Sequence, residues 1–441
     1  MTAIWETVLG NTGIELGPES NFFAAGGNSL LLLVLQTEIM KKFGSKPSLA
    51  VLFNARNLAA MAASMEEKKS AGELIHTLPT VDWSAETSVD QPLANMRHKP
   101  RSRPFGQGLI VVLTGATGFL GRHTVADLVA RSDIQAIHCL AVRNITSTIA
   151  QSLQALSNRK VFLHPGDLTA PRLGLMEEEE RLLFADADVI IHNGADVSFM
   201  KPYFALRQPN VGSTKYLAEM AVKYGLQSFH YVSTTGVALL SDKSPVLEGS
   251  LHANAPHKDI DGYVTGKWVS ECYLENLNKS SGLPITIYRP STITGPGAPT
   301  LDITHNVVKF SRKMKAIPHL DGWRGYFDAI LVHNCARYLI DALLSKGSAP
   351  RTDYIHLSGE IVVEIATIKD FLEKQTRYEF AVLNMASWVK GARGQGLHEL
   401  VGTYLLGLAS SRVKPRMPRL MTSLPWGKTA AQGEEGVRDV S

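Results

Sequence analysis

The segment that decides the fold is Leu109-Ile-Val-Val-Leu-Thr114, followed at once by Gly115-Ala-Thr-Gly118-Phe-Leu-Gly121. The six residues before the first glycine are apolar except for Thr114 and mostly β-branched, which predicts a buried strand, and the glycines open an amphipathic helix. Gly115 permits a tight turn, Gly118 lets the backbone approach a phosphate, and Gly121 lets the helix pack closely on the strand. Because N–H groups at such a helix N-terminus attract anions, the segment predicts a dinucleotide site. The residues predicted to contact the dinucleotide here are Gly115, Thr117, Gly118, Phe119, Leu120 and Gly121.

Five more short apolar runs follow this strand, with helical patterns between them. They lie at 137–142, 160–164, 189–193, 228–233 and 286–289. Six strands that alternate with helices predict an α/β fold with a doubly wound parallel sheet of the Rossmann type. Beyond residue 290 the alternation becomes irregular. Helical patterns at 306–316, 332–344, 368–375 and 397–409 predict a smaller substrate-side lobe there.

The glycine spacing GxxGxxG is one residue longer than the common dinucleotide fingerprint and resembles that of the extended short-chain dehydrogenase/reductase superfamily. Arg143 ends the second predicted strand. A carboxylate at that place usually holds a free ribose, whereas a guanidinium pairs with a 2′-phosphate, so Arg143 favours NADPH over NADH. The resemblance implies further cofactor contacts after the third, fourth and sixth strands, from Asp167, Leu168, Asn193, Gly194, Ala195 and Pro290.

Tyr263 and Lys267 are four residues apart, which places both on one face of a helix. Together with the strand that ends near Thr234, they resemble the Ser/Thr–Tyr–Lys catalytic set of the same superfamily. Hydride addition to a carbonyl builds negative charge on oxygen, so an acid must supply a proton near neutral pH. The resemblance implies that the Tyr263 phenol is this acid, and that Lys267 lowers its pKa and holds the nicotinamide ribose. Thr234 would donate a hydrogen bond to the carbonyl oxygen.

The end of that strand carries three consecutive hydroxyls, Ser233, Thr234 and Thr235. The superfamily keeps an apolar residue three positions after its catalytic hydroxyl. Val237 stands at that distance from Thr234, so Thr234 is the predicted catalytic hydroxyl.

From residue 4 to about residue 65 the apolar residues recur at helical spacing, which predicts a small all-helical unit. Within it, Asn21-Phe-Phe-Ala-Ala-Gly-Gly-Asn-Ser29-Leu places a serine where a loop meets an apolar helix. Capping of that helix is the simplest role for Ser29. The whole string, however, resembles the phosphopantetheine attachment site of acyl and peptidyl carrier domains. The resemblance implies that a phosphopantetheinyl transferase places a 4′-phosphopantetheine arm on Ser29, and that the arm's thiol binds an acyl chain as a thioester.

These patterns predict a small all-α four-helix carrier domain at 1–67, a linker at 68–107 and a reductase domain at 108–441, whose substrate lobe lies mainly at 291–420. The linker ends in a basic stretch that includes Arg97 and Arg101; a solvated tether is its commoner meaning, and a contact surface is the alternative. The chain begins inside what should be the first carrier helix, with Trp5 already in it. This start indicates a fragment of a larger synthetase or a shortened gene model.

A carrier followed by such a reductase resembles the terminal module of fungal polyketide–nonribosomal peptide synthetases, and the stretch at 192–199 is especially close to that group. The resemblance implies NADPH-dependent reductive release of the thioester as an aldehyde, with a second reduction to an alcohol left open. Upstream synthetase modules or another acyl donor would supply the chain. The alternative is a Dieckmann-type cyclising release by the same fold without redox chemistry. A third hypothesis is a non-catalytic carrier or docking protein.

Composition argues against several other classes of protein. The 441 residues include 45 Lys+Arg and 41 Asp+Glu, a net charge of only +4, which argues against nucleic acid as a partner. The three cysteines, Cys139, Cys272 and Cys335, lie far apart, so neither a disulfide framework nor a metal site is predicted. Apolar runs are far shorter than the ~20 residues of a membrane span, and the N-terminus lacks the order of a signal peptide. The sequence therefore predicts a cytoplasmic protein without a membrane partner.

Overall fold

The computed structural model describes residues 1–10, 15–22, 24–27, 29–44, 47, 49–55, 57–63, 81–101, 107–157, 159–198, 201–256, 261–299, 302–345, 349–410 and 414–425. The chain divides into two compact units. One unit consists of Met1–Glu86, Asp196–Arg207 and His257–Gly266, and the other of Thr87–Ala195, Gln208–Pro256 and Lys267–Ser441.

The N-terminal part of the first unit is helical and has its own apolar core. Its helices include α1 (Thr2–Leu9), α2 (Ser29–Phe43) and α3 (Leu49–Asn54), and residues 58–63 are helical as well. Trp5 is fully buried among them, with its ring edge-on to Phe22 at 5.0 Å between centroids and its Nε1 3.3 Å from Met61 Sδ. The remaining buried members of this core are Ile4, Val8, Phe22, Leu32, Leu35, Ile39, Leu52 and Leu58. The small all-helical fold predicted for this segment is confirmed.

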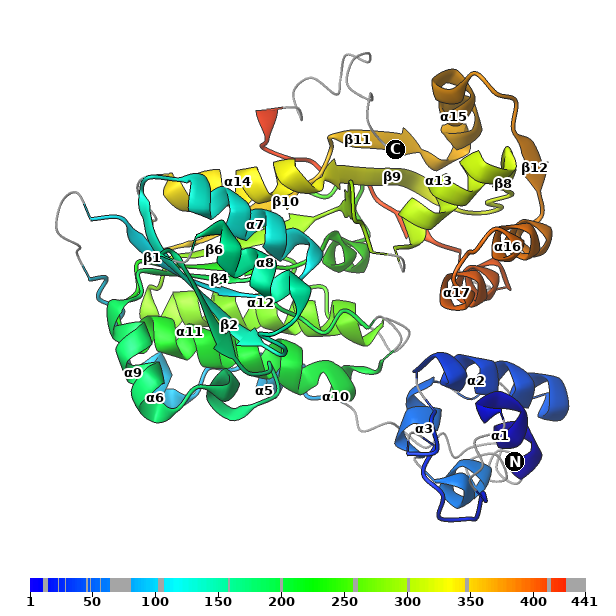
Figure 1. Ribbon diagram of the computed structural model, residues 1–441, viewed down its shortest axis with the longest axis horizontal. Coiled ribbons are helices and arrows are strands. Elements are labelled where there is room, and N and C mark those ends of the chain that lie inside the picture. Colours follow the sequence, from blue (N-terminus) through cyan, green and yellow to red (C-terminus); the bar gives the residue numbers. More distant parts are fainter. Residues whose placement is uncertain are drawn as a thin grey trace. The chain divides into compact units, whose positions relative to one another are not determined.

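A seven-stranded sheet forms the centre of the second unit (Figure 1), with the strand order β10-β6-β5-β4-β1-β2-β3. Every neighbouring pair in it is parallel. Its strands are β1 (Leu109–Thr114), β2 (Ile134–Val142), β3 (Val161–Pro165), β4 (Val189–His192), β5 (Ser228–Val232), β6 (Ile285–Pro290) and β10 (Thr352–Leu357). The predicted doubly wound parallel sheet is therefore confirmed.

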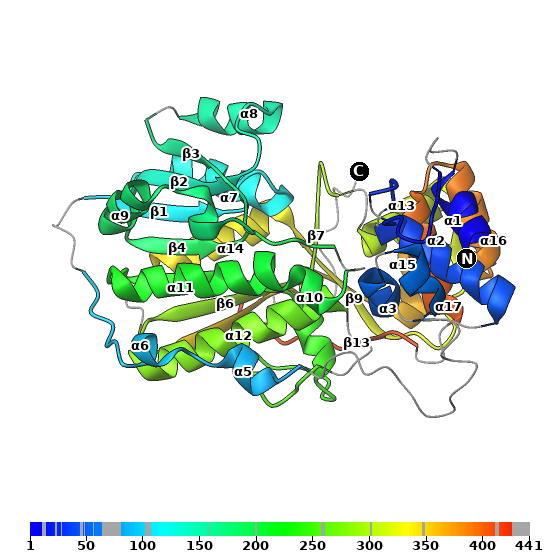
Figure 2. The same cartoon turned by 90° about the horizontal axis from the view of Figure 1, so that it is seen from below.

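Helices cover both faces of this sheet (Figures 1 and 2). One face carries α7 (Phe119–Ala130), α8 (Thr148–Leu156) and α14 (Val332–Leu344), and the other α9 (Glu177–Asp186), α11 (Ser213–Lys223) and α12 (Gly262–Ser281). Side chains alternate along β1, so that Val111 and Leu113 join the core of the first face and Val112 that of the second. The carboxyl ends of all seven strands meet at one edge, where ligands bind in sheets of this type.

A second, smaller sheet lies in the C-terminal lobe. It consists of β7 (Thr292–Thr294), β9 (Arg324–Leu331), β11 (Ile361–Glu364) and β13 (Arg416–Met417), while β8 (Ala316–Pro318) pairs with β12 (Ala381–Leu383). The lobe's helices are α13 (Ile303–Met314), α15 (Ile368–Thr376), α16 (Met385–Gly394) and α17 (Glu399–Ser410). Trp388 is fully buried in the lobe's core and donates from Nε1 to the carbonyl of Ala316 at 2.9 Å.

The remaining described elements are short. They are α5 (Trp83–Thr87), α6 (Gln91–Ala94), α10 (Tyr203–Leu206), a π-helix at Arg207–Gly212 and 3-10 helices at Pro171–Gly174, Thr235–Leu240 and Ile365–Thr367. Within the residues described, no helix has the length and apolarity needed to cross a bilayer.

The structure adds a seventh strand to the six predicted ones. β10 lies inside the segment predicted as substrate lobe, and so does α14, which covers the main sheet. β10 was missed because it is an edge strand whose first four residues are only half-buried, so it lacks a continuous apolar run. The four predicted C-terminal helices correspond to α13, α14, α15 and α17. α16 was missed; it contains Gly391 and ends at Gly394, and glycine weakens a helical pattern.

The second half of the predicted linker differs from a solvated tether. Arg97 donates to the carbonyl of Ser280 at 3.0 Å, and the ring of His98 bonds the carbonyl of Leu226 at 2.6 Å. Arg101 donates to the carbonyls of Phe184 and Ala187. Most of these carbonyls belong to the last turns of α9 and α12 or follow them directly, where backbone oxygens lack helical partners and attract cations. The basic stretch is thus a contact surface, the alternative that the sequence analysis ranked second.

Candidate active site

The glycine loop joins β1 to α7 in a conformation that needs its glycines. Gly115 has φ +72°, and a Cβ added there would lie 2.7 Å from the Cα of Gly194. A Cβ on Gly121 would lie 2.0 Å from the carbonyl oxygen of Gly115. Gly118 is the N-cap residue of α7, whose first residue is Phe119. The N–H groups of the first turn of α7 therefore lie beside an open backbone cradle, which fits a dinucleotide pyrophosphate.

Gly121→Ala is expected to weaken NADPH binding by at least 100-fold, because its Cβ would displace the backbone of Gly115. The change in cofactor fluorescence on titration measures the dissociation constant. Gly407→Ala in α17 is the matched control, since a Cβ there meets open space, and it should leave the constant unchanged. Equal affinities for both variants would contradict the role assigned to the cradle.

A buried hydrogen-bond chain holds the end of β4 against this loop. The N–H of Gly194 donates to Thr114 Oγ1 at 2.9 Å, and Thr114 Oγ1 lies 2.7 Å from Nδ1 of His192. Nε2 of His192 continues the chain to Thr214 Oγ1 at 3.0 Å. Burial, with the Lys267 charge, lowers the pKa of His192 to about 3, so the ring is neutral. Sequence reasoning placed the segment here but did not find this role of His192.

This chain of hydrogen bonds places three of the predicted cofactor residues next to the glycine loop. Asn193 Nδ2 donates to the carbonyl of Gly115 at 3.2 Å. Gly194 is close enough to Gly115 that neither position has room for a Cβ, and Ala195 follows directly. The glycine loop and the end of β4 therefore lie side by side.

Arg143 and Asp167 follow the neighbouring strands β2 and β3 and form an ion pair, with Arg143 Nε 2.5 Å from Asp167 Oδ2. Hydrogen bonds from Thr169 and from Arg143 lower the pKa of Asp167 to about 2, so its carboxylate is charged at neutral pH. The Arg143 side chain remains 68% exposed. An exposed ion pair adds little to the stability of the fold. What matters here is that the Arg143 guanidinium is accessible at the carboxyl edge of the sheet. Leu168 is buried beside it.

Lys267 of α12 is 2% exposed and points at the end of β5. Its Nζ donates to the carbonyl of Val232 at 2.6 Å and lies 4.6 Å from the centre of the Tyr231 ring. Burial lowers the pKa of Lys267 to about 7, against a smaller raising effect of the Glu271 charge. Near neutral pH the amine and ammonium forms therefore coexist.

Tyr263 lies four residues before Lys267 on the same helix and is half-buried. Burial and the Asp261 carboxylate raise the pKa of its phenol. This direction is opposite to the lowering by Lys267 that the resemblance implies, because both causes of the shift raise the pKa. The phenol consequently keeps its proton at neutral pH, as a proton donor requires.

The lowered pKa of Lys267 predicts how the free energy of unfolding depends on pH. Its folded-state pKa of about 7 lies below the ordinary 10.5, so burying the ammonium costs stability below pH 7, and the cost declines as pH rises from 7 to 10.5. Lys267→Met should therefore be more stable than wild type by a few kcal/mol at pH 6 to 7, and the difference should shrink towards pH 10. Denaturant unfolding at several pH values measures it. A difference independent of pH would contradict the assigned pKa.

Thr234 follows β5 and is the N-cap of the 3-10 helix Thr235–Leu240. Its Oγ1 accepts from the N–H of Gly236 at 3.1 Å, which leaves the hydroxyl proton available to another acceptor. Ser233, by contrast, is buried and donates to Glu271 Oε1 at 2.5 Å. The geometry supports the choice of Thr234 over Ser233. Pro290 ends β6, on the other side of β5 from β4.

An apolar pocket opens in the C-terminal lobe between α13, α15 and the strands β7, β9 and β11. Phe327, Val363 and Phe371 are among its walls, and Thr292, two residues after Pro290, lies at its lining. Arg312 and Gln375, which are hydrogen-bonded at 2.8 Å, supply polar groups. Its composition suits an apolar chain with few hydrogen-bonding groups.

Ser29 is the first residue of α2, as predicted, and only its backbone is described. The loop before it is tight: Gly26 has φ +94°, and a Cβ on Gly27 would lie 2.3 Å from the carbonyl oxygen of Phe22. Such a loop suits a serine presented at a helix start.

Within the described part of the chain, the structure indicates neither a metal site nor a disulfide. Among those residues no group of three or more His, Cys, Asp or Glu side chains is arranged to hold a metal ion. The three cysteines are buried free thiols, and burial raises the pKa of Cys139 to about 12.

Two family models match the chain. Residues 113–339 match the NAD-binding model described as male sterility protein, and residues 1–65 match the model described as phosphopantetheine attachment site. The first therefore runs from the end of β1 into α14 and leaves out β10, and the second covers the N-terminal helices.

Curated relatives are fungal synthetases. A polyketide synthase-nonribosomal peptide synthetase hybrid, himA, from Aspergillus japonicus is 42% identical over 96% of this chain and 11% of its own length. The polyketide synthase-nonribosomal peptide synthetase ACE1 of Pyricularia oryzae is 37% identical over 96% of this chain and 10% of its own length. The chain thus spans about a tenth of the length of these relatives.

Two of the solved structures with a similar fold contain reductase domains. The terminal R domain from the myxalamid PKS-NRPS pathway is 28% identical with a TM-score of 0.64, over 80% of this chain and 92% of that one. A thiolation-reductase di-domain from an archaeal non-ribosomal peptide synthetase, 20% identical with a TM-score of 0.62, covers 92% of this chain and 86% of its own, and shows the fold.

Proposed function

The chain belongs to the male sterility protein family of NAD-binding domains, and on this premise we propose that it releases a carrier-bound acyl or peptidyl thioester by NADPH-dependent reduction to an aldehyde. The observation that carries the proposal is that Lys267 of α12 donates to the end of β5, two residues before Thr234, in a sheet whose glycine loop fits a dinucleotide. Tyr263 lies four residues before Lys267 on α12. The likeness to the myxalamid R domain and to fungal synthetases supports it.

The residues proposed to hold NADPH lie in the glycine loop, at the ends of β2 and β3, after β4 and at the end of β6. They are Gly115, Thr117, Gly118, Phe119, Leu120, Gly121, Arg143, Asp167, Leu168, Asn193, Gly194, Ala195 and Pro290, together with Tyr263 and Lys267 of α12. When bound, NADPH supplies the hydride. The first turn of α7 would hold the pyrophosphate, and Arg143 the 2′-phosphate.

The proposed catalytic residues act on the substrate's carbonyl oxygen. Thr234 donates a hydrogen bond to it, because its own oxygen already accepts from Gly236 and its proton remains available. Tyr263 delivers a proton to the oxygen as negative charge develops there. Lys267, held by the Val232 carbonyl, supplies positive charge near the developing anion and a donor for the nicotinamide ribose.

The acyl chain would come from the N-terminal domain. We place the carrier domain at 1–67 and the reductase at 108–441, with the substrate lobe mainly at 291–420. Ser29 would be modified by a phosphopantetheinyl transferase, upstream synthetase modules would load the arm, and the cytoplasm is the proposed compartment. The apolar pocket of the lobe offers a place for the part of the chain distant from the thioester.

Cyclising release without redox chemistry and a non-catalytic docking protein are not favoured. Tyr263 and Lys267 are both present, and Lys267 is positioned at the strand end that carries Thr234. A test is direct: incubation with NADPH and a soluble acyl thioester should oxidise one NADPH for each aldehyde formed. A cyclised product formed without NADPH would refute the proposal.

Arg143→Ala should raise the dissociation constant of NADPH about 10- to 100-fold and that of NADH less than about threefold, because hydrogen bonds to a charged phosphate are lost. Fluorescence titration with both cofactors measures the change. The matched control is Arg131→Ala, which breaks another exposed Arg–Asp pair, to Asp341 at 2.5 Å, at the far end of β2. Parallel weakening of NADPH and NADH by Arg143→Ala would contradict the assignment.

A further inference from the structure

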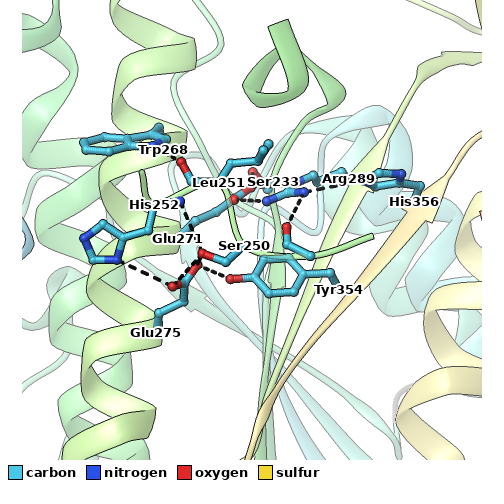
Figure 3. A network of polar contacts seen from close by, with 11 residues as sticks. Ser233, Ser250, Leu251, His252, Trp268, Glu271, Glu275, Arg289, Tyr354 and His356 are labelled. Atoms are coloured by element: carbon cyan, nitrogen blue, oxygen red, sulfur yellow. Dashed lines mark hydrogen bonds and ion pairs between the residues drawn. The ribbon is translucent and has the colours of Figure 1, made fainter. Parts of the chain in front are cut away.

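We propose that Glu271 is a positioning residue for the reduction, which together with Lys267 fixes the strand end that carries Thr234. This inference rests on the function proposed above, because it concerns how the chain presents Thr234 and Lys267. Its evidence is separate and lies in the buried polar network of α12, β5, β6 and β10 (Figure 3).

Two residues of α12 form hydrogen bonds with two successive residues at the end of β5. Lys267 Nζ donates to the carbonyl of Val232 at 2.6 Å, and Ser233 Oγ donates to Glu271 Oε1 at 2.5 Å. Lys267 and Glu271 are four residues apart and therefore share one face of the helix. Both are buried, at 2% and 1% exposed. Thr234 is the next residue along the strand, so its position relative to the helix is set by these two contacts.

The carboxylate that receives Ser233 is itself held in orientation. Arg289 of β6 is fully buried and donates from Nη2 to Glu271 Oε2 at 2.6 Å and from Nε to Oε1 at 3.1 Å. A bidentate pair fixes both the place and the plane of a carboxylate. Nη1 of Arg289 donates further to the carbonyl of Gly249 at 2.9 Å. A buried ion pair does not by itself indicate a gain in stability. We therefore attribute to this pair the positioning of the residues that it holds.

The same carboxylate acts on the charge of Lys267. Burial lowers the pKa of Lys267, and the Glu271 charge opposes that effect. The groups that face this region from the other elements are His192 of β4, Tyr231 of β5, Arg289 of β6 and His356 of β10. Burial lowers the pKa of His192 to about 3 and that of His356 to about 4, so both rings are neutral at pH 7. Glu271 thus supplies negative charge that favours the ammonium form.

Glu275 provides a matched control one turn further along α12. It is also buried, at 5% exposed. Its carboxylate accepts from Ser250 at 2.7 and 2.9 Å and from the Tyr354 hydroxyl, and lies 3.5 Å from His252 Nδ1. These partners belong to the loop before α12 and to β10, not to the end of β5. Loss of Glu275 therefore disturbs the network without releasing Ser233.

The experiment compares Ser233→Ala, the double variant Glu271→Met/Arg289→Met, and Glu275→Gln. Glu271 and Arg289 are replaced together because removal of Glu271 alone would leave a buried unpaired charge. Three quantities are measured: kcat and the KM for NADPH with a soluble acyl thioester, the pKa of Lys267 from NMR titration of its Nζ in cofactor-free protein, and stability to denaturant.

Ser233→Ala should lower kcat about 10- to 100-fold, with the KM for NADPH within about twofold and the Lys267 pKa unchanged. The double variant should lower kcat at least as much and shift the Lys267 titration to lower pH. Glu275→Gln should change kcat less than about threefold even where it loses stability.

Three results would overturn the inference: a kcat of Ser233→Ala within threefold of wild type, a Lys267 titration that does not move in the double variant, or a loss of kcat in Glu275→Gln equal to that in Ser233→Ala. The proposed function fails separately, when wild-type protein oxidises no NADPH with any thioester tested. The titration in cofactor-free protein still tests the influence of Glu271 in that case.

Discussion

Replacement of Tyr263 by Phe is expected to lower kcat for thioester reduction by about 10²- to 10⁴-fold, the range that a general acid contributes. The substitution removes one oxygen from a half-buried ring, so packing should persist. The phenol is the proposed proton donor, and its raised pKa keeps it protonated over the working pH range. NADPH oxidation with a soluble acyl thioester measures the effect.

Tyr273→Phe is the control for this variant. Tyr273 lies on the same helix, buried in the core of the sheet face that α12 covers, and should tolerate the change with kcat within about twofold. If Tyr263→Phe kept more than a third of the wild-type kcat while Tyr273→Phe behaved as expected, Tyr263 would not be the acid.

Ser29→Ala is expected to abolish release of carrier-bound product and to leave reduction of a soluble thioester unchanged. The reason is that the arm needs the Ser29 hydroxyl, whereas the sheet and its residues do not. Intact mass after incubation with a phosphopantetheinyl transferase and coenzyme A reports the modification, and product analysis reports release.

Ser20→Ala, also in the N-terminal helical segment, controls for loss of an ordinary hydroxyl. Its side chain accepts from the N–H of Gly17 at 2.8 Å, so its removal disturbs a loop but no proposed attachment point. This variant should still gain the arm. A mass increase in Ser29→Ala, or none in Ser20→Ala, would contradict the assignment of Ser29.

The parts of the fold that sequence predicts well are those governed by local chemistry. β1 and its glycine loop are read from adjacent residues, and five of the six predicted strands lie inside the sheet, where helices cover them on both faces. β10 is an edge strand with half-buried positions, so its membership of the sheet depends on pairing with β6 across some 60 residues. Nothing in its own sequence marks that partner.

The candidate site divides in the same way. The resemblance implied that Asn193 and Gly194 contact the cofactor; their closeness to Gly115 is added by the structure, in which the strand ends of a parallel sheet share an edge. The pairing of Glu271 with Arg289 could not be foreseen, since a lone glutamate on an amphipathic helix ordinarily faces solvent. The raised pKa of Tyr263 was likewise out of reach, because burial of the side chain is a property of the folded packing.

The basic stretch before β1 shows the limit of charge patterning. Arg97 and Arg101 look like part of a solvated tether, yet both donate to carbonyls at the C-terminal ends of helices. Charge alone does not distinguish these two environments, because the acceptors are backbone oxygens that any sequence provides.

The central claim is that this chain transfers hydride from NADPH to the carbonyl carbon of an acyl group held on Ser29. The most direct measurement loads the arm on Ser29 with a model acyl group, adds NADPH deuterated at the transferred position, and analyses the released product by mass spectrometry. We expect an aldehyde, or its alcohol, that carries the deuterium on the former thioester carbon, together with a free arm thiol. Release of an unlabelled acid or a cyclised product, with the deuterated NADPH unconsumed, would contradict it.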